Sequence, residues 1–406
     1  MAPAILRNGQ PNMDPSIVEQ IHQCREELIS LRRDFHRHPE LGFEEHRTAG
    51  VIEAYLKELG LDSRRMAGTG VVALLEGHRP GPVLMLRADM DALPVVEKND
   101  VAYRSQNPGV MHACGHDAHM AMLLVAAKIL SQNREAFAGT IKLVFQPNEE
   151  IAGALPMIKA GVLEAPRVDA VMGLHVWTPV ESGKIGITEG PVMGGLDVFK
   201  MTIFGRGGHT GVPEDAVDPV IAAANLIQTA QTIQTREISQ LKSTVIMFGK
   251  IAGGSKSNII PDKVALEGSI RFLYKGGPES IEQPTERFVR IAEQVCQTHR
   301  CTCEIEIAHE NIPLINDPQM TAMARRTAVD VFGGENALVD NVTIASEDFS
   351  EFSERVPGVF MFLGAGNAEK GTTVSHHNPR FDIDEDILVN GACMYVSGAI
   401  HFFQSQ

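Results

Sequence analysis

Residues 111–150 read MHACGHDAHMAMLLVAAKILSQNREAFAGTIKLVFQPNEE, and they predict one helix followed by one strand. Apolar side chains at helical spacing mark a helix at about 118–130, and TIKLVF at 140–145 is typical of a strand. A cysteine and histidines stand at the start of the helix, and paired glutamates follow the strand. The stretch therefore predicts an α/β fold with reactive groups at the ends of its elements.

The same alternation of helix and strand continues on both sides of this stretch. The further predicted elements are helices within 15–59, strands at 70–75 and 82–86, a helix near 154–160 and a strand near 169–174. The strands are apolar runs of the kind that parallel sheets bury on both faces. The predicted architecture is a catalytic domain with a mainly parallel central sheet flanked by helices.

A second pattern begins near residue 190. Strands are predicted at 196–204, 243–248, 263–272 and 302–308, with helices near 218–231 and 278–298. This β-α-β-β-α-β order predicts an inserted ferredoxin-like α+β domain. The α/β pattern then returns, with a helix near 319–332 and a strand at 358–363. The predicted organisation is residues 1–189 and 309–406 for the catalytic domain and 190–308 for the insertion.

Composition excludes several classes of protein. The 406-residue chain has a formal net charge of −15, which disfavours nucleic acids and anionic membranes as partners. Its six cysteines form no paired framework. No apolar stretch was found that approaches the roughly 20 residues of a membrane span. We therefore expect a soluble cytoplasmic protein with no nucleic-acid or membrane partner.

The segment MHACGHDAH, residues 111–119, is rich in side chains that bind metals. Cys114 and His116 stand two residues apart, so both can face one point from a turn. A thiolate and an imidazole suit zinc, manganese or a similar ion. The alternative is a polar helix start capped by Asp117. A thiol and the imidazoles of His116 and His119 are poor capping groups, which favours the metal site.

The segment FQPNEE, residues 145–150, places Glu149 and Glu150 at the carboxyl end of a strand, where ligands gather in α/β sheets. One carboxylate can coordinate a metal while the other takes a proton from the water that the metal activates. Considered alone, an acidic pair is more often a solvated surface loop.

Three other places carry similar side chains at strand ends or in loops: Asp89 and Asp91 in LRADMDALP, His175 after a buried strand, and His376 and His377 in SHHNPRF. A lone histidine is more often structural than a ligand. Together with Cys114 and the paired glutamates, these residues offer a donor set for two ions about 3.5–4 Å apart.

At this point the chain resembles a known family, the amidohydrolase branch of the zinc-dependent aminoacylases and carboxypeptidases. That branch includes hippurate hydrolases, N-acyl-amino-acid amidohydrolases and plant auxin-conjugate hydrolases. The motifs that carry the resemblance occur in the family's order: LRRDFHRHPELGFEE, LRADMDALP, MHACGHDAH, FQPNEE, GRGGHTGVP, SNIIPD, SEDFS and HNPRFDIDED. The resemblance implies metal-dependent hydrolysis of the amide bond of N-acyl amino acids or related small amide conjugates, releasing a carboxylic acid and an amino acid.

Carried over residue by residue, the resemblance implies two divalent ions per subunit, zinc or manganese first and cobalt or nickel as further options. The implied metal ligands are Cys114, His116, Glu150, His175 and His377. Cys114 would bridge the ions, and Glu149 would be the general base and then the general acid. Asp89 would not bind an ion itself but would orient one of the metal ligands. His377 is preferred to His376 because of its spacing to Pro379.

The insertion carries three further residues that the resemblance singles out. His209 of GRGGHTGVP would stabilise the tetrahedral oxyanion across a dimer interface, so the insertion would act in closure and dimerisation. Asn258 and Arg271 would bind substrate, with the guanidinium gripping a carboxylate; the alternative for Arg271 is a structural surface pair. We expect a homodimer or homotetramer. Asn148 departs from the family pattern and leaves the substrate range open. The extra histidine His376 could be an alternative ligand or a partner of one.

Other functions remain as alternatives. Nucleotide binding is disfavoured because the glycine-rich segments lack the required spacings, and a serine hydrolase because the chain has no G-x-S-x-G elbow. A non-catalytic metal-binding protein on the same fold would have no use for Glu149 beside its ligands. The remaining alternative within the hydrolases is a metallo-dipeptidase or exopeptidase, and no sequence feature decides against it.

Overall fold

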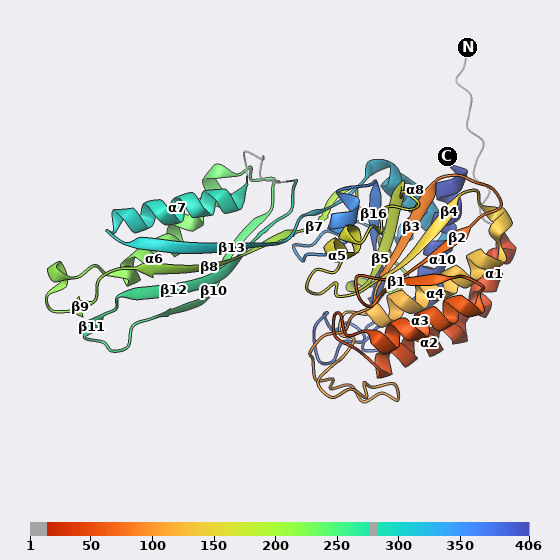
Figure 1. The fold of residues 1–406 in the computed structure, drawn as a ribbon, viewed down its shortest axis with the longest axis horizontal. Helices are drawn as coiled ribbons and strands as arrows, with labels where there is room; N and C mark the ends of the chain where they lie inside the picture. Colours follow the sequence, from red (N-terminus) through yellow and green to blue (C-terminus); the bar gives the residue numbers. More distant parts are fainter. Residues whose placement is uncertain (1–13, 276–282, 406) are drawn as a thin grey trace, which may run out of the picture. The chain divides into compact units, whose positions relative to one another are not determined.

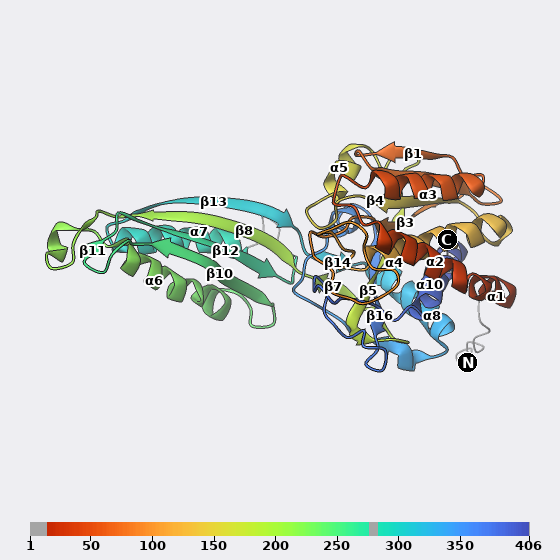
Figure 2. The ribbon, with the colours of Figure 1, turned by 90° about the horizontal axis from the view of Figure 1, so that it is seen from below.

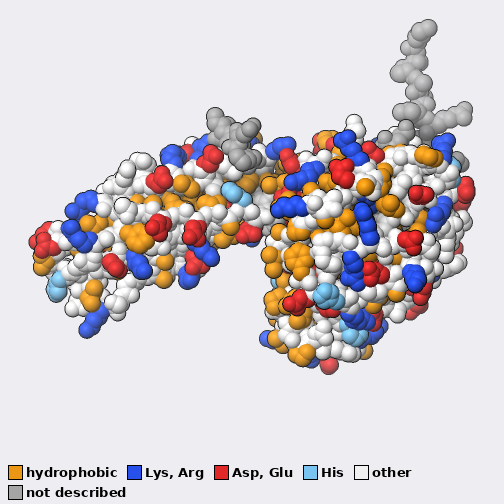
Figure 3. Space-filling model, viewed as in Figure 1, with side chains coloured by type: hydrophobic (Ala, Val, Ile, Leu, Met, Phe, Trp, Pro, Cys, Tyr) orange, Lys and Arg blue, Asp and Glu red, His pale blue; other side chains and the backbone are white. Residues whose placement is uncertain are grey.

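The computed structural model describes residues 14–275 and 283–405, which divide into two compact units. The first unit comprises Met1–Gly190, Asn316–Asn341 and Glu351–Gln406. The second comprises Pro191–Ile315 and Val342–Ser350, so it contains nearly all of the insertion expected at 190–308 and extends beyond it. One reason is that its last sheet strand continues to Asn311. On the face seen in Figure 3, acidic and basic side chains are interspersed over each unit.

The first unit is built on an eight-stranded sheet with the order β1-β2-β4-β3-β5-β16-β6-β15. The strands are β1 (Ser63–Met66), β2 (Gly70–Glu76), β3 (Val83–Asp89), β4 (Thr140–Gln146), β5 (Ala170–Glu181), β6 (Ile185–Gly186), β15 (Leu338–Val339) and β16 (Gly358–Gly366). The central strands β4, β3, β5 and β16 are parallel, whereas β1, β2 and β6 add antiparallel pairs toward the margins. The predicted α/β class is confirmed, with antiparallel additions.

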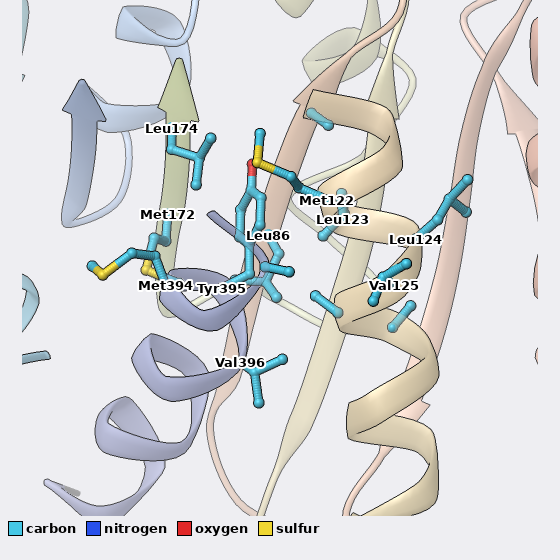
Figure 4. Close-up of a cluster of buried hydrophobic side chains, with 14 of the residues drawn as sticks. Leu86, Met122, Leu123, Leu124, Val125, Met172, Leu174, Met394, Tyr395 and Val396 are labelled. Carbon is cyan, nitrogen blue, oxygen red and sulfur yellow. The ribbon is translucent and has the colours of Figure 1, made fainter. Parts of the chain in front are cut away.

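Most of the helices pack on one face of this sheet (Figure 1). The helices of the unit are α1 (Pro15–Gln23), α2 (Arg25–Arg37), α3 (His46–Glu58), α4 (His116–Gln132), α5 (Ala154–Lys159), α8 (Pro318–Phe332) and α10 (Ile387–Gln404), and α9 (Ser350–Ser353) begins at the last unit boundary. Figure 4 shows Leu86, Met172 and Leu174 of the strands near Met122 of α4 and Tyr395 of α10. Full burial of each such side chain contributes about 1.5–3 kcal/mol.

Alternate strand residues point to the opposite face of the sheet, which carries both polar and apolar side chains. Lys142 of β4 is fully buried there, and its Nζ donates to the carbonyls of Val162, Glu164 and Pro166 at 2.8, 2.9 and 2.8 Å. These bonds satisfy the ammonium group and hold the segment after α5 against the sheet.

Helix α10 corrects one expectation from the sequence. Among the described residues it is the one helix long and apolar enough to cross a membrane by length and composition, yet 89% of that window is buried inside the protein. A helix that is hydrophobic all round is typical of the core of a large domain. The absence of a one-sided apolar stripe also explains why the helix was not predicted.

The second unit is a ferredoxin-like α+β fold. Its strands are β8 (Gly195–Phe204), β10 (Thr244–Gly253), β12 (Lys263–Phe272) and β13 (Thr302–Asn311), and its main helices are α6 (Pro219–Ala230) and α7 (Pro284–Thr298). The sheet order is β10-β12-β8-β13, and every pair is antiparallel. Figure 2 shows both helices against this sheet, where Phe199, Leu226 and Phe288 form part of the core. The helix expected at 278–298 begins at Pro284, and residues 276–282 lie outside the described part.

Short strands complete the second unit. They are β7 (Gly190–Met193) paired with β14 (Leu314–Asn316), and β9 (Gly208–His209) paired with β11 (Ile259–Ile260). The pair β7 and β14 lies where the chain enters and leaves the insertion, and β9 carries His209. None of the four was predicted, since two to four residues are too few for a periodic signal.

Candidate metal centre

The predicted ligands of the first unit come from a helix start, a strand end, a loop and the interior of a strand, where His175 had been expected just after the strand. Cys114 and His116 flank Gly115, which has a φ of 89° and precedes α4. A Cβ at Gly115 would lie 2.3 Å from Cγ2 of Val176, so only glycine fits both the left-handed backbone and the space. This turn directs a thiol and an imidazole toward the same point. Glu150 follows β4, and His175 lies within β5.

The predicted ligands form two clusters of donor atoms that share one residue. Cys114, His116 and His175 form the first cluster, and Cys114, Glu150 and His377 form the second; within each, the donor atoms lie within 4.8 Å of one another. Sγ of Cys114 is 3.4 Å from Nε2 of His175, and Nε2 of His377 is 3.3 Å from Oε1 of Glu150. The structure thus brings together every side chain that was predicted to bind metal.

Hydrogen bonds fix which nitrogen of each buried histidine is available. Nδ1 of His116 lies 2.9 Å from the carbonyl oxygen of Asp91 and donates to it, which leaves Nε2 as the acceptor. Nδ1 of His175 donates in the same way to the carbonyl of Val176 at 2.6 Å, and its Nε2 faces Cys114. Both rings therefore present a lone pair toward the cluster, as metal ligation requires.

His119 was a further metal-capable candidate, and its contacts assign it a supporting role. Its Nε2 accepts from the backbone N–H of Val176 at 2.9 Å, and its Nδ1 donates to Oδ1 of Asp89 at 2.6 Å. Both ring nitrogens are therefore engaged with protein groups. His119 therefore connects β5 to the start of α4, in place of the metal-binding role that its position in the sequence suggested.

The carboxylates around the donor clusters create a negative electrostatic environment that favours bound cations. Burial, followed by the charges of Glu150 and Glu149, raises the pKa of the Cys114 thiol well above its usual value. Burial lowers the pKa of His116, but the carboxylates of Asp89 and Asp91 outweigh this effect and raise it to about 10. Divalent cations stabilise such a group of carboxylates. On binding, they replace the protons of the thiol and the imidazole.

Two unsatisfied atoms give an independent test of whether the residues fit such ions. Nε2 of His116 and Oε1 of Glu150 are buried and have no hydrogen-bond partner among the described residues. Buried polar atoms are rarely left unpaired, because each costs about 1–3 kcal/mol. His116 belongs to the first cluster and Glu150 to the second, so one cation in each cluster would give each of these atoms a partner. The donor set fits two divalent ions.

Two aspartates support the ligands in different ways. Asp89, predicted to orient a ligand, accepts from His119 and from Nη1 of Arg87 at 2.7 Å, and its Oδ2 lies 3.8 Å from Nε2 of His116. Asp91 contacts the ligands more directly: Oδ1 is 3.2 Å from Nδ1 of His116, and Oδ2 accepts from the N–H of Glu150 at 3.1 Å. Sequence spacing could not distinguish the two carboxylates.

Glu149 lies beside the first cluster. Its side chain is only 9% exposed, and Oε2 is 3.9 Å from Nε2 of His116. The preceding Asn148 has a φ of 54°, a left-handed conformation that asparagine tolerates better than most residues. That conformation accounts for asparagine at this position and turns the two glutamates toward the cluster.

The two adjacent histidines of SHHNPRF have different positions. His377 has a φ of 63° and points to Glu150, whereas His376 donates from Nε2 to the carbonyl of Val176 at 2.9 Å. The ring of His376 also stacks on Trp177 with centroids 4.5 Å apart. His376 is therefore engaged outside the donor clusters, and His377 is the member of the pair within them.

A buried arginine links the segments that carry ligands, and no sequence pattern predicted its role. Arg32 of α2 is fully buried; its Nε donates to Asp117 at 2.9 Å and its Nη2 to Asp382 at 2.8 Å. Asp117 follows His116, and Asp382 closes the loop that begins at His377. Burial opposes ionisation of Asp117, but Arg32 and His36 hold the pKa of that carboxyl well below its usual range.

The remaining predicted residues belong to the second unit. His209 and Asn258 are exposed and line a cavity of about 970 Å³, together with Lys263 and the glycine-rich segment 252–255. Nδ1 of His209 accepts from the N–H of Gly211 at 2.9 Å. Arg271 is half-buried on β12, where Nη1 donates to the carbonyl of Ile344 at 3.2 Å, and burial lowers its pKa.

Known proteins resemble this chain over nearly its whole length. Residues 85–400 match the model of peptidase family M20/M25/M40. Thermostable carboxypeptidase 2 of Saccharolobus solfataricus is 36% identical over 389 residues, which cover 94% of this chain and 97% of the relative. N-acetyl-L-cysteine deacetylase of Bacillus subtilis is 38% identical over 382 residues, covering 93% and 89%. The structure of the Bacillus subtilis YXEP protein, a dinuclear metal binding peptidase, matches with a TM-score of 0.82 and 30% identity, covering 97% of this chain and 100% of that one.

Proposed function

Because the chain belongs to peptidase family M20/M25/M40 and is a metal-dependent hydrolase of amides, we propose that it cleaves N-acyl amino acids or related small amide conjugates. The products would be a carboxylic acid and an amino acid. The observation that carries the proposal is the pair of donor clusters sharing Cys114, with the carboxylate of Glu149 directly beside them.

The proposed cofactors are two divalent ions per subunit, zinc or manganese first and cobalt or nickel as alternatives. Cys114 with His116 and His175 would hold one ion, and Cys114 with Glu150 and His377 the other. When bound, the ions supply Lewis-acid activation of a water molecule and of the amide carbonyl. The thiolate of Cys114 would contribute to both sites.

Glu149 is the proposed proton carrier. Its carboxylate would accept the proton of the attacking water and return it to the nitrogen of the leaving amine, as a single group can do in successive steps. The nearly complete burial of the side chain limits exchange of that proton with bulk water. Held by Asp91 at Nδ1, His116 keeps its ring still while this transfer takes place.

The residues of the second unit are proposed to act on the substrate. His209 would donate to the oxyanion that forms on the amide carbonyl, and Asn258 and Arg271 would bind polar groups of the substrate. The exposure of His209 in β9 is compatible with contact to a substrate or to a second subunit. A homodimer or homotetramer and a cytoplasmic location are further parts of this proposal.

A metallo-exopeptidase is the second candidate, and a specific observation favours it: one of the similar proteins is a carboxypeptidase. The exopeptidase would release a terminal amino acid from a peptide, whereas the amidohydrolase would remove a simple acyl group from the nitrogen of an amino acid. A non-catalytic metal-binding role is less compatible with Glu149, a buried carboxylate beside the donor clusters.

A substrate panel separates these candidates. The purified protein is stripped with a chelator, reconstituted with Mn²⁺ or Zn²⁺, and assayed on N-acetyl, N-benzoyl and indole-acetyl amino acids beside dipeptides with a free amino group. We expect turnover of the acylated compounds and loss of activity after chelation. Preference for the dipeptides would support the exopeptidase, and failure to cleave any amide would overturn both.

A further inference from the structure

Glu45 is a buried carboxylate that the proposed mechanism does not use. It stands at the start of α3, where its side chain makes no capping hydrogen bond to that helix. The residue is 0% exposed and turns inward. Burial of a carboxylate costs free energy unless hydrogen bonds compensate, so its partners indicate what it is placed to hold.

The partners of Glu45 lie on separate segments of the first unit. Oε2 accepts from the hydroxyl of Thr69, the residue that precedes β2. Oε1 accepts from the backbone N–H of Asn148 at 2.9 Å. The second bond reaches the turn that carries Glu149 and Glu150, more than one hundred residues further along the chain.

That turn is tight and under backbone strain. The carbonyl of Asn148 accepts from the N–H of Ala152 at 3.0 Å, and Asn148 itself has a φ of 54°. A Cβ at Gly153 would lie 1.7 Å from the carbonyl oxygen of Pro147, so the chain closes on itself with no spare room. Such a conformation persists only where the surroundings hold it.

Two buried carboxylates hold the amides on either side of Glu149. Glu45 accepts from the N–H of Asn148, and Asp91 accepts from the N–H of Glu150 at 3.1 Å. The backbone of Glu149 is therefore fixed from both ends by charge-assisted hydrogen bonds, which are about twice as strong as neutral ones. The two carboxylates come from different loops, so neither replaces the other.

From this geometry we infer that Glu45 is a positioning residue for the centre, acting through the amide of Asn148 to hold Glu149 and Glu150 in place. The inference rests on the proposed two-ion function. It makes a selective prediction, because Glu150 belongs to only one of the two donor clusters. Loss of Glu45 should weaken the ion bound by Cys114, Glu150 and His377 and leave the other cluster nearly unchanged.

The test compares variants by calorimetric titration of the metal-free protein with Mn²⁺. Glu45→Met fills a similar volume without an acceptor, and Glu45→Ala serves as a second removal if the methionine variant does not fold. Glu150→Gln identifies which binding step belongs to the second cluster. We expect Glu45→Met to weaken that same step by about 10–100-fold and to lower kcat similarly, as for other residues that support metal ligands.

Three control variants separate positioning from a structural role. Glu45→Gln keeps an oxygen for the N–H of Asn148 and should recover most of the lost affinity. Thr69→Val removes only the hydroxyl contact and should bind both ions within about threefold of the wild type, since it leaves the bond to Asn148 in place. Glu44→Gln changes the exposed neighbouring carboxylate and should have no effect.

The outcomes distinguish the inference from the function on which it rests. Two Mn²⁺ steps in the wild type with unchanged steps and kcat in Glu45→Met would overturn the inference alone. If Glu45→Met weakens both steps equally and lowers Tm, and Thr69→Val does the same, Glu45 has a structural role. That result would also overturn the inference. A wild-type protein without Mn²⁺ binding would overturn the two-ion function and the inference with it.

Discussion

Sγ of Cys114 lies 3.4 Å from Nε2 of His175, and the same sulfur belongs to the cluster that contains Glu150 and His377. A single side chain thus connects the two groups of donors. With ions bound, its thiolate would serve both sites.

Replacing Cys114 should therefore affect both ions. We expect Cys114→Ala to lose most of its bound metal after dialysis, whereas His175→Ala and His377→Ala should each retain about one ion per subunit. Elemental analysis of the dialysed proteins gives the stoichiometry directly. Two retained ions in Cys114→Ala would contradict the shared role of the sulfur.

Replacing Glu149 should stop turnover without removing metal. Glu149→Gln preserves shape but cannot accept a proton, and loss of a general base typically lowers rate by about 10²–10⁴-fold. Steady-state kcat and metal content are measured on the same preparation, with Glu44→Gln as an exposed control. Turnover within a few-fold of wild type would exclude Glu149 as the proton carrier.

The two supporting aspartates should differ in effect. Asp91→Asn turns an amide donor toward either His116 or the N–H of Glu150, so we expect metal affinity to fall by about 10–100-fold. Asp89→Asn disturbs His119 and Arg87, which lie outside the donor clusters, and should weaken binding less. Titration of both variants with Mn²⁺ measures the difference, and the reverse order would assign the orienting role to Asp89.

His209 provides a test of the second unit. His209→Ala should lower kcat by about 10²–10³-fold, as expected for loss of one oxyanion donor, while metal content stays at the wild-type level. The exposed histidine His22 of α1 offers a matched control. Wild-type kcat in His209→Ala would remove this residue from the mechanism.

The single tryptophan of the chain reports on the centre. Trp177 stacks on His376, and its ring centroid lies 5.7 Å from that of His175. Tryptophan emission should change when a chelator removes the ions and return when Zn²⁺ is added, because an ion at Nε2 of His175 changes the electric field at the neighbouring indole. The response should be lost in His175→Ala; a response retained in that variant would come from elsewhere.

Sequence patterns predicted most of the regular structure. The strand expected at 263–272 is β12, and the resemblance to the amidohydrolases is confirmed by the family match. The polar strand β1 and the uniformly apolar helix α10 were missed, because neither shows the alternation or the one-sided stripe that periodicity detects. Local pattern is informative only where one face of an element differs from the other.

Much of the donor set was predictable, because metal-binding side chains stand before a helix and at the end of a strand, where Cys114 and Glu150 lie. His175 was expected just after a strand, but it lies within β5, which continues to Glu181. Asp89 was the one supporting residue that was predicted. Arg32 and Glu45 act across long stretches of chain, and nothing in their own neighbourhood of the sequence indicates a contact with the centre. Their roles follow from distances that only the folded chain provides.

The order of the ligands along the chain also matters during synthesis on the ribosome. Cys114, His116 and His175 all precede the insertion, whereas His377 follows it. A nascent polypeptide thus acquires every donor for one ion before the second unit has been translated, and the last donor for the other only near the end of translation. The centre is arranged so that one cation could be captured early and the other only at release.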